Sequence, residues 1–124
     1  MTQTLAIAVG GALGSVLRFW MSNWTHAQLG RGFPYGTLMV NVLGCLLMGV
    51  LFVWLTERAS LAPVWRAGLL IGVLGGFTTF SAFSMETVSL FEAGAQVKAL
   101  LNVVSSVVVC LGATWVGMIV ARQL

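Results

Sequence analysis

The stretch Gly75-Gly-Phe-Thr-Thr-Phe-Ser-Ala-Phe-Ser84 lies within a membrane-length apolar segment, although its glycines and hydroxyl side chains disrupt or hydrate a helix. Lipid offers no hydrogen bonds, so such backbone is tolerated at bilayer depth only where it lines a cavity or is buried in protein. We therefore predict that the helix containing this stretch is broken, and that the break marks a site for a polar species.

The composition places the chain in a membrane. It has 124 residues, of which 59% are hydrophobic and only 7% are charged, so it cannot cover a soluble globule with solvated side chains. A membrane span needs about 20 apolar residues, and apolar stretches near this length lie at residues 5–24, 37–55, 64–91 and 97–120. We predict an all-α membrane protein in which residues 1–124 form a single domain of four transmembrane helices, the third being broken.

Basic residues are balanced between the two sides of this predicted bundle. Four spans place both termini on one side, and the basic residues of that side are Arg58, Arg66 and Arg122. Those of the other side are Arg31, Lys98 and, if it lies beyond the midpoint of its span, Arg18. Because an excess of Lys and Arg sets orientation, the balance predicts insertion both ways up and an antiparallel, dual-topology homodimer. The scattered charges predict no nucleic-acid partner.

Groups that carry out catalysis are nearly absent. The chain has three acidic residues and one histidine, without a paired-carboxylate, Cys/His or phosphate-binding pattern. Cys45 and Cys110 fall inside predicted spans, where we interpret them as small core residues rather than as a disulfide. We predict that the protein is not an enzyme, and that it conducts or transports.

Polar residues within the spans are the candidates for a pathway. Ser106, Cys110 and Thr114 are spaced by four and share one face of the last predicted helix. This face can replace the hydration shell of a small ion, or its hydroxyls can bond carbonyls of their own helix. Glu86 is an intramembrane charge, which usually marks a pathway or a partner. Arg18 either extends to the interface or borders a vestibule in which it concentrates anions.

Phe80 and Phe83 are three residues apart, a spacing that on an intact helix is typical of lipid-facing or core positions. Aromatic rings, however, carry a positive edge as well as a negative face. Two ring edges and the amide N–H of Asn41 could therefore solvate a small anion in a narrow dry pore, where a full positive charge would hold the anion too tightly.

At these residues the chain resembles the bacterial fluoride channel family, known as Fluc or CrcB, over essentially its whole length. The motifs are Gly-Gly-x-x-Gly-x-x-x-Arg ending at Arg18, Gly36-Thr-Leu-x-Val-Asn41, and the run from Gly75 to Ser84. The resemblance implies a passive, fluoride-selective channel in the bacterial inner membrane. It also implies a dual-topology homodimer, surrounded by lipid, that exports cytoplasmic fluoride through two antiparallel pores.

The resemblance also implies roles for individual residues. Phe80 and Phe83 would line the pores, Asn41 would end the vestibule near Arg18, and a polar track beside the phenylalanines would comprise Ser81, Glu86, Ser106 and Thr114. Carbonyls of Gly75 and Thr78 from two copies would hold a structural Na⁺ at the dimer interface, as unwound membrane helices can do. Two residues depart from the family pattern: Ala82 replaces a common threonine, and Cys110 replaces a serine of the track.

Two other functions fit the same short, apolar chain. Small four-helix multidrug exporters driven by protons also insert both ways up, but they rely on a glutamate in the first span, where this chain has Arg18 and no acid. A non-conducting assembly subunit, whose glycines only pack helices, would pass no ion at all.

Overall fold

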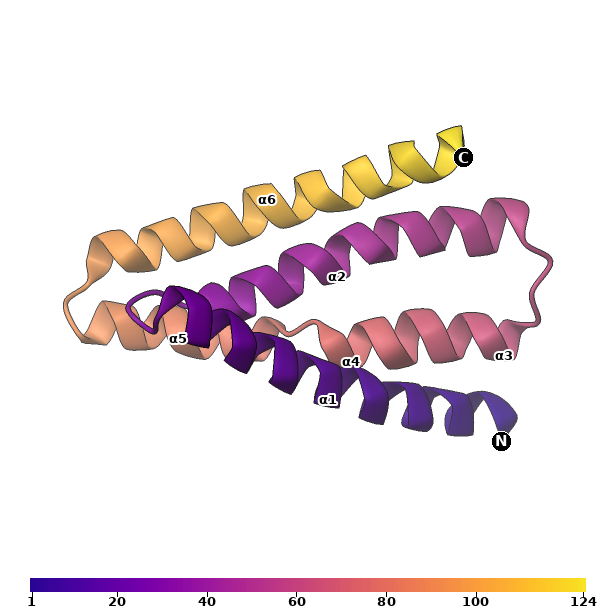
Figure 1. Ribbon diagram of the computed structural model, residues 1–124, viewed down its shortest axis with the longest axis horizontal. Helices are drawn as coiled ribbons and strands as arrows, with labels where there is room; N and C mark the ends of the chain where they lie inside the picture. Colours follow the sequence, from indigo (N-terminus) through magenta and orange to yellow (C-terminus); the bar gives the residue numbers. More distant parts are fainter.

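The computed structural model describes all 124 residues, as helices joined by short loops (Figure 1). In chain order the elements are α1 (Thr2–Leu29), α2 (Tyr35–Val53), η1 (Trp54–Arg58), α3 (Pro63–Arg66), η2 (Ala67–Leu74), α4 (Gly75–Phe77), α5 (Phe80–Glu92) and α6 (Gln96–Gln123), of which η1 and η2 are π-helical. Four stretches are long and apolar enough to cross a membrane: Thr2–Leu29, Tyr35–Arg58, Pro63–Glu92 and Gln96–Gln123. The predicted all-helical chain with four apolar helices is confirmed.

The first loop is shorter than the sequence indicated. The apolar stretch at residues 5–24 predicts a first helix that ends near residue 24, but α1 continues to Leu29. Thr25 is buried, and its hydroxyl donates to the Met21 carbonyl at 2.8 Å, so it extends the helix instead of ending it. The helix stops at Gly30, whose φ of 82° suits a residue without a Cβ. Composition alone did not distinguish this buried threonine from a loop threonine.

Glycines bring the helices together in two pairs, α1 beside η2 and α2 beside α6 (Figure 1). A Cβ on Gly10 or Gly14 of α1 would overlap the carbonyl oxygen of Gly68 or Val73, respectively. On the other pair, a Cβ on Gly117 would overlap the Leu46 carbonyl oxygen. Where lipid is as apolar as the side chains, close backbone approach of this kind supplies the packing energy between helices.

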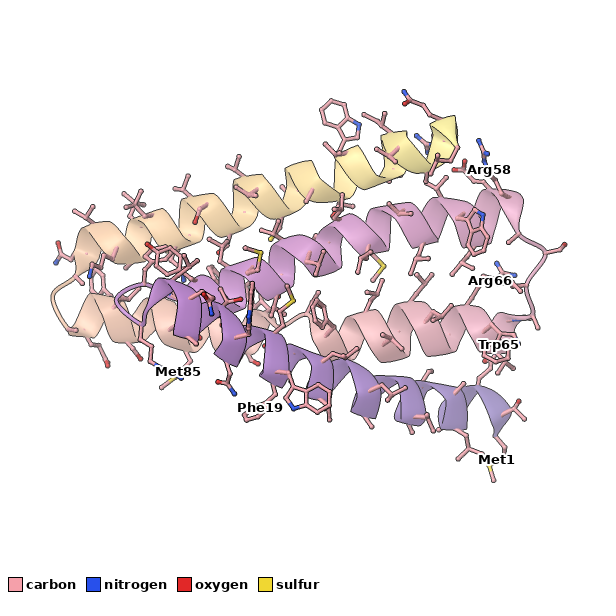
Figure 2. The ribbon with its side chains drawn as sticks, viewed as in Figure 1. Met1, Phe19, Arg58, Trp65, Arg66 and Met85 are labelled. Atoms are coloured by element: carbon pink, nitrogen blue, oxygen red, sulfur yellow. The ribbon has the colours of Figure 1, made fainter.

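Large apolar side chains point away from the bundle. Figure 2 shows this for Phe19, Trp65 and Met85, which are 64%, 65% and 69% exposed. The buried apolar core is correspondingly small and includes Val40 and Leu55. An apolar exterior over a small interior is the surface that a lipid environment requires.

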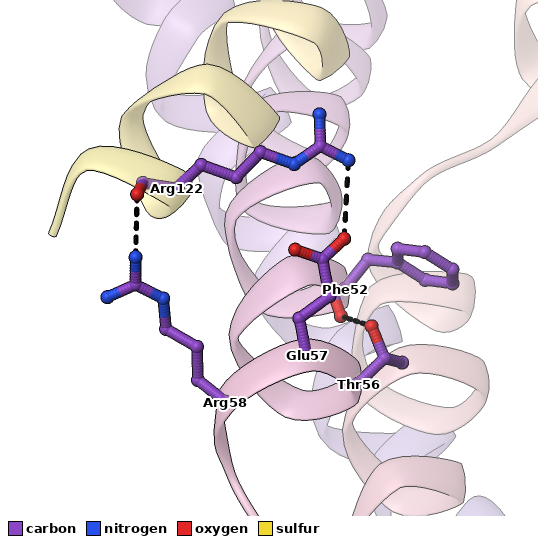
Figure 3. Close-up of polar contacts among 5 residues, drawn as sticks. All are labelled: Phe52, Thr56, Glu57, Arg58 and Arg122. Carbon is purple, nitrogen blue, oxygen red and sulfur yellow. Dashed lines mark hydrogen bonds and ion pairs between the residues drawn. The ribbon is translucent and has the colours of Figure 1, made fainter.

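Both chain termini lie at the same end of the bundle (Figure 1), as four spans predict. Arg58 and Arg66 lie at that end too (Figure 2). Arg58 donates to the Arg122 carbonyl at 2.6 Å, and Arg122 pairs with Glu57 at 3.2 Å. Figure 3 draws both contacts. Because both members of this ion pair are about half exposed, it contributes little to stability. The contacts tie the end of η1 to the end of α6.

Candidate functional site

Two residues between α4 and α5 have an extended backbone. Thr78 has φ −83° and ψ 157°, and Thr79 has φ −152° and ψ 119°. Figure 1 shows this non-helical link within the third apolar stretch. In a continuous helix the N–H of Thr79 would donate to the carbonyl of Gly75. In the structure it does not, so the Gly75 carbonyl loses that donor.

Asn41 holds Thr79 in place from α2. The Thr79 N–H donates to Asn41 Oδ1 at 2.7 Å, and Asn41 Nδ2 donates to the Thr79 carbonyl at 2.9 Å. The orientation of the amide follows from chemistry, because the backbone N–H can only donate and the carbonyl can only accept. Asn41 therefore supplies the two hydrogen bonds that a helix would have given to the N–H and carbonyl of Thr79. The second N–H of the Asn41 amide makes no bond to Thr79.

The hydroxyls of Thr78 and Thr79 form hydrogen bonds at the two helix ends that flank the extended link. Thr79 is the N-cap of α5, because its Oγ1 accepts from the Ala82 N–H at 3.2 Å and also lies 3.2 Å from Ser81 Oγ. Thr78 Oγ1 donates to the Leu74 carbonyl at 2.9 Å. The Thr79 hydroxyl thus supplies an acceptor at the start of α5, while the Leu74 carbonyl accepts from both the N–H and the hydroxyl of Thr78.

A cavity of about 460 Å³, which we call the polar cavity, lies on one side of Thr79. Its lining comprises Arg18, Ser22, Thr37, Val40, Thr79, Ser81, Ala82 and Glu86. The expected vestibule residue Arg18 and two expected track residues, Ser81 and Glu86, are therefore brought together. Arg18 forms no ion pair, and its Nη1 donates to the Thr78 carbonyl at 3.4 Å. Its charge is thus available to anions in this cavity.

A second cavity of about 320 Å³, the aromatic cavity, lies beside the first. It is lined by Asn41, Cys45, Thr78, Thr79, Phe80, Phe83, Ser106, Val107, Cys110 and Leu111. The rings of Phe80 and Phe83 are 5.2 Å apart between centroids and tilted by 50°. Thr79 lines both cavities, so the two meet at the residue that Asn41 holds. Phe80 is 77% exposed in the single chain.

Glu86 lies between the polar cavity and a third one near the first loop, which His26 and Arg31 also line. Its Oε1 accepts from the Thr37 hydroxyl at 2.7 Å. Its Oε2 is buried without a hydrogen-bond partner. A buried acceptor without a partner is unusual, so this oxygen has capacity for a further donor.

The structure separates two of the expected site residues from these cavities. Thr114 lines neither cavity, and its hydroxyl donates to the Cys110 carbonyl at 3.1 Å, the alternative that the sequence left open. Ser106, on the same predicted face, is buried and lines the aromatic cavity. Gly75 is exposed, and a Cβ there would meet only the Leu70 carbonyl oxygen, at 3.8 Å. Gly75 thus lies on the outer surface of the single chain.

Sequence reasoning missed a second polar clamp, between α6 and α5. Asn102 is 2% exposed and donates to Thr87 Oγ1 at 2.9 Å, and Thr87 donates to the Phe83 carbonyl at 2.7 Å. This chain of hydrogen bonds positions the turn that carries Phe83. The available signal was an amide inside an apolar span, the same signal that singled out Asn41.

The fold and these cavities define a small helical membrane protein with polar and aromatic cavities between its helices. The family model described as CrcB-like protein, Camphor Resistance (CrcB), matches residues 5–118. The chain belongs to this family, which confirms the resemblance drawn from the three motifs, and it is a multi-pass membrane protein.

Individual relatives agree. The chain is 48% identical over 124 residues, all of both chains, to the Fluoride-specific ion channel FluC of Geobacter metallireducens. It is 49% identical to the protein of that name from Coxiella burnetii, over 98% of this chain and 99% of the relative. The protein of the same name from Methylococcus capsulatus is 56% identical over 96% of this chain. That relative is longer, and the match covers 52% of its length.

Proposed function

We propose that this chain is a passive, fluoride-selective channel that works in the bacterial inner membrane as an antiparallel homodimer with two pores and exports fluoride from the cytoplasm. The observation that carries the proposal is the aromatic cavity, which two phenylalanine rings and an asparagine side chain line together. Relatives that match the whole chain are named fluoride channels.

The pathway that we propose begins in the polar cavity. The unpaired guanidinium of Arg18 attracts anions there, and the hydroxyls of Ser22 and Ser81 replace part of their water. The anion then passes Thr79 into the aromatic cavity, where the free N–H of Asn41 and the edges of the Phe80 and Phe83 rings solvate it. Partial charges bind weakly enough for rapid release.

A partner copy would complete this pathway. Phe80 is 77% exposed and Gly75 is exposed, so a single chain leaves one side of the aromatic cavity and the residue near the end of the third helix's first part uncovered. The near-equal numbers of basic residues at the two ends favour insertion both ways up. An antiparallel partner would then supply the second wall of each of two pores.

The Gly75 and Thr78 carbonyls suit a structural Na⁺ between two copies. Carbonyl oxygens are ligands for hard cations, and Gly75 has lost its Thr79 donor. Arg18 uses one lone pair of the Thr78 carbonyl through a long bond of 3.4 Å, which leaves the other lone pair. When bound, the ion would neutralise the negative ends of these carbonyl dipoles at the centre of the dimer.

A proton-coupled multidrug exporter has less support. The first span contains Arg18 and no acid, and Glu86, the acid between the cavities, is bonded to Thr37. None of the relatives described above is named as an exporter. Substrate uptake driven by a proton gradient and abolished by Glu86→Gln would favour the exporter over the channel.

Fluoride efflux from liposomes containing the purified protein tests the proposal. A fluoride electrode should record rapid release once the membrane potential is short-circuited with valinomycin, whereas liposomes loaded with chloride should release no more than protein-free ones. Comparable chloride release would refute fluoride selectivity. Absence of any ion release would favour the non-conducting assembly subunit.

A further inference from the structure

The two cysteines of the chain face one cavity. Cys45 lies on α2 and Cys110 on α6, the helices that pack side by side. Both thiols are free, and both line the aromatic cavity. The pathway proposed above uses neither thiol.

We propose that Cys45 and Cys110 together bind one thiophilic d¹⁰ metal ion, such as Hg²⁺, inside the aromatic cavity. Two S–H bonds break, two metal–sulfur bonds form and two protons leave to bulk water, while no electron is transferred. Thiolates select soft ions over hard ones such as Na⁺ or Mg²⁺. The bond requires the thiolate form, which the metal itself induces by displacing the proton.

Charge neutrality suits this site to the interior of the membrane. Two thiolates neutralise the charge of a divalent ion, so the complex carries no net charge. This favours binding at bilayer depth, where charges are costly. The lining includes four apolar side chains besides the two thiols: Phe80, Phe83, Val107 and Leu111. The cavity volume of about 320 Å³ far exceeds the about 30 Å³ that one water occupies, so the cavity has room for a single metal ion.

The bound ion would also obstruct permeation, because it shares its cavity with Phe80, Phe83 and Asn41. This consequence rests on the proposed channel function, whereas the binding itself does not. Metal binding and ion flux are therefore measured separately.

The binding test titrates purified protein in detergent with mercuric chloride and counts the remaining thiols with a chromogenic thiol reagent. Because the chain contains only two cysteines, one equivalent of Hg²⁺ per chain should remove both thiols and produce the ultraviolet absorption of mercury–thiolate bonds. The single variants Cys45→Ser and Cys110→Ser are matched controls. Each variant should hold mercury through one metal–sulfur bond, and excess mercaptoethanol should remove this mercury. The complex with both thiols of the unmodified chain should resist mercaptoethanol and release its mercury only to the dithiol dimercaprol.

Two results would overturn the proposal. If the unmodified chain needs two equivalents of Hg²⁺ to lose its two thiols, each cysteine reacts alone. If either single variant loses all of its thiol with half an equivalent per chain, the ion bridges two copies instead of Cys45 and Cys110 of one copy.

Flux measurements on the same samples separate this proposal from the channel function. Mercury should stop fluoride efflux in the unmodified protein, dimercaprol should restore it, and mercury should not change the rate of the variant carrying both Cys45→Ser and Cys110→Ser. Stoichiometric binding by a protein that never releases fluoride would leave the metal site standing and refute the channel. If the protein releases fluoride but its two thiols react independently with mercury, the channel function stands and the shared metal site is refuted.

Discussion

At the scale of single residues, Asn41 connects the backbone to the site. Its side chain satisfies both backbone groups of Thr79, the residue at which the polar and aromatic cavities meet. Buried backbone groups need such partners because an unmade hydrogen bond costs about 1–3 kcal/mol. Asn41 therefore supports the local backbone as well as lining the aromatic cavity.

Asn41→Asp tests the first of these roles. A carboxylate still accepts from the Thr79 N–H but cannot donate to the Thr79 carbonyl, so we expect a loss of stability of about 1–3 kcal/mol. A lower midpoint of thermal unfolding in detergent would record it. Asn23→Asp, at an exposed position of α1, is the matched control and should leave the midpoint unchanged. Equal midpoints for the two variants would contradict the role of Asn41.

Phe80→Ile tests the ring edge. Isoleucine keeps the apolar bulk but lacks the positive edge, whose interactions contribute about 0.5–1.5 kcal/mol. Because 1.4 kcal/mol corresponds to a factor of ten, we expect fluoride efflux from liposomes to fall by up to about tenfold. Phe91→Ile on the same helix is the control, since Phe91 is 60% exposed and lines none of the three cavities. Unchanged efflux in Phe80→Ile would exclude coordination by the ring.

At the scale of elements, the extended link between α4 and α5 depends on α1 and α2. Asn41 on α2 takes the hydrogen bonds of Thr79, while Arg18 on α1 reaches the Thr78 carbonyl. Close packing of α1 on η2 and α4 places Arg18 there, and glycines allow that packing. The geometry of the site is thus set by how near the helices approach.

Gly14→Ala should separate α1 from the third apolar stretch. The added Cβ would overlap the Val73 carbonyl oxygen and lie 2.8 Å from the Phe77 backbone nitrogen, which cannot move without distorting the helix. Overpacking of this kind costs about 1–3 kcal/mol, so the thermal midpoint should fall. At Gly11, one turn away, the nearest atom would be the Gly72 oxygen at 3.9 Å. Gly11→Ala should therefore be tolerated, and equal effects of the two changes would refute this packing argument.

At the scale of the whole molecule, one chain leaves its site open. Phe80 is 77% exposed and Gly75 lies on the surface, although we assign the first to the pore wall and the second to a shared ion site. The opposing ends of the bundle carry similar basic charge. Both features are accounted for if the functional unit contains two antiparallel copies.

Insertion in both orientations is directly measurable. A reporter fused to the C-terminus that fluoresces only in the cytoplasm, and another that is active only outside it, should each give a signal in about half of the molecules, because the basic residues favour neither side. Adding two lysines near the C-terminus should place that end in the cytoplasm more often and raise the signal of the cytoplasmic reporter. Signal on one side only in the unaltered chain would rule out the antiparallel homodimer.

Removal of Na⁺ should weaken the dimer. Replacing Na⁺ by the large organic cation N-methylglucamine removes the ion that we expect the Gly75 and Thr78 carbonyls to share. Crosslinking or single-molecule photobleaching should then show more monomer, and restoring Na⁺ should reverse the change. K⁺ at the same ionic strength controls for screening. A dimer population that is independent of Na⁺ would contradict the site.

The class of the protein could be predicted from the sequence because hydropathy is a sum over neighbouring residues. The four apolar stretches, their helical state and the family motifs needed no long-range information. Similar local reasoning ended the first helix near residue 24, whereas Thr25 is buried and continues α1. It also overlooked Asn102, whose importance comes from its bond to Thr87, 15 residues away.

The sequence by itself determined that this is an all-helical membrane protein, and that glycines and hydroxyls gather in residues 75–84 of its third apolar stretch. Only the tertiary structure decided that the extended residues are Thr78 and Thr79, that Thr114 bonds its own helix, and that Phe83 and Ser106 share a cavity with Cys45. The reason is physical. Apolar character is local, whereas the partner of a buried polar group, such as Asn41 for Thr79 across 38 residues, exists only once the helices have packed.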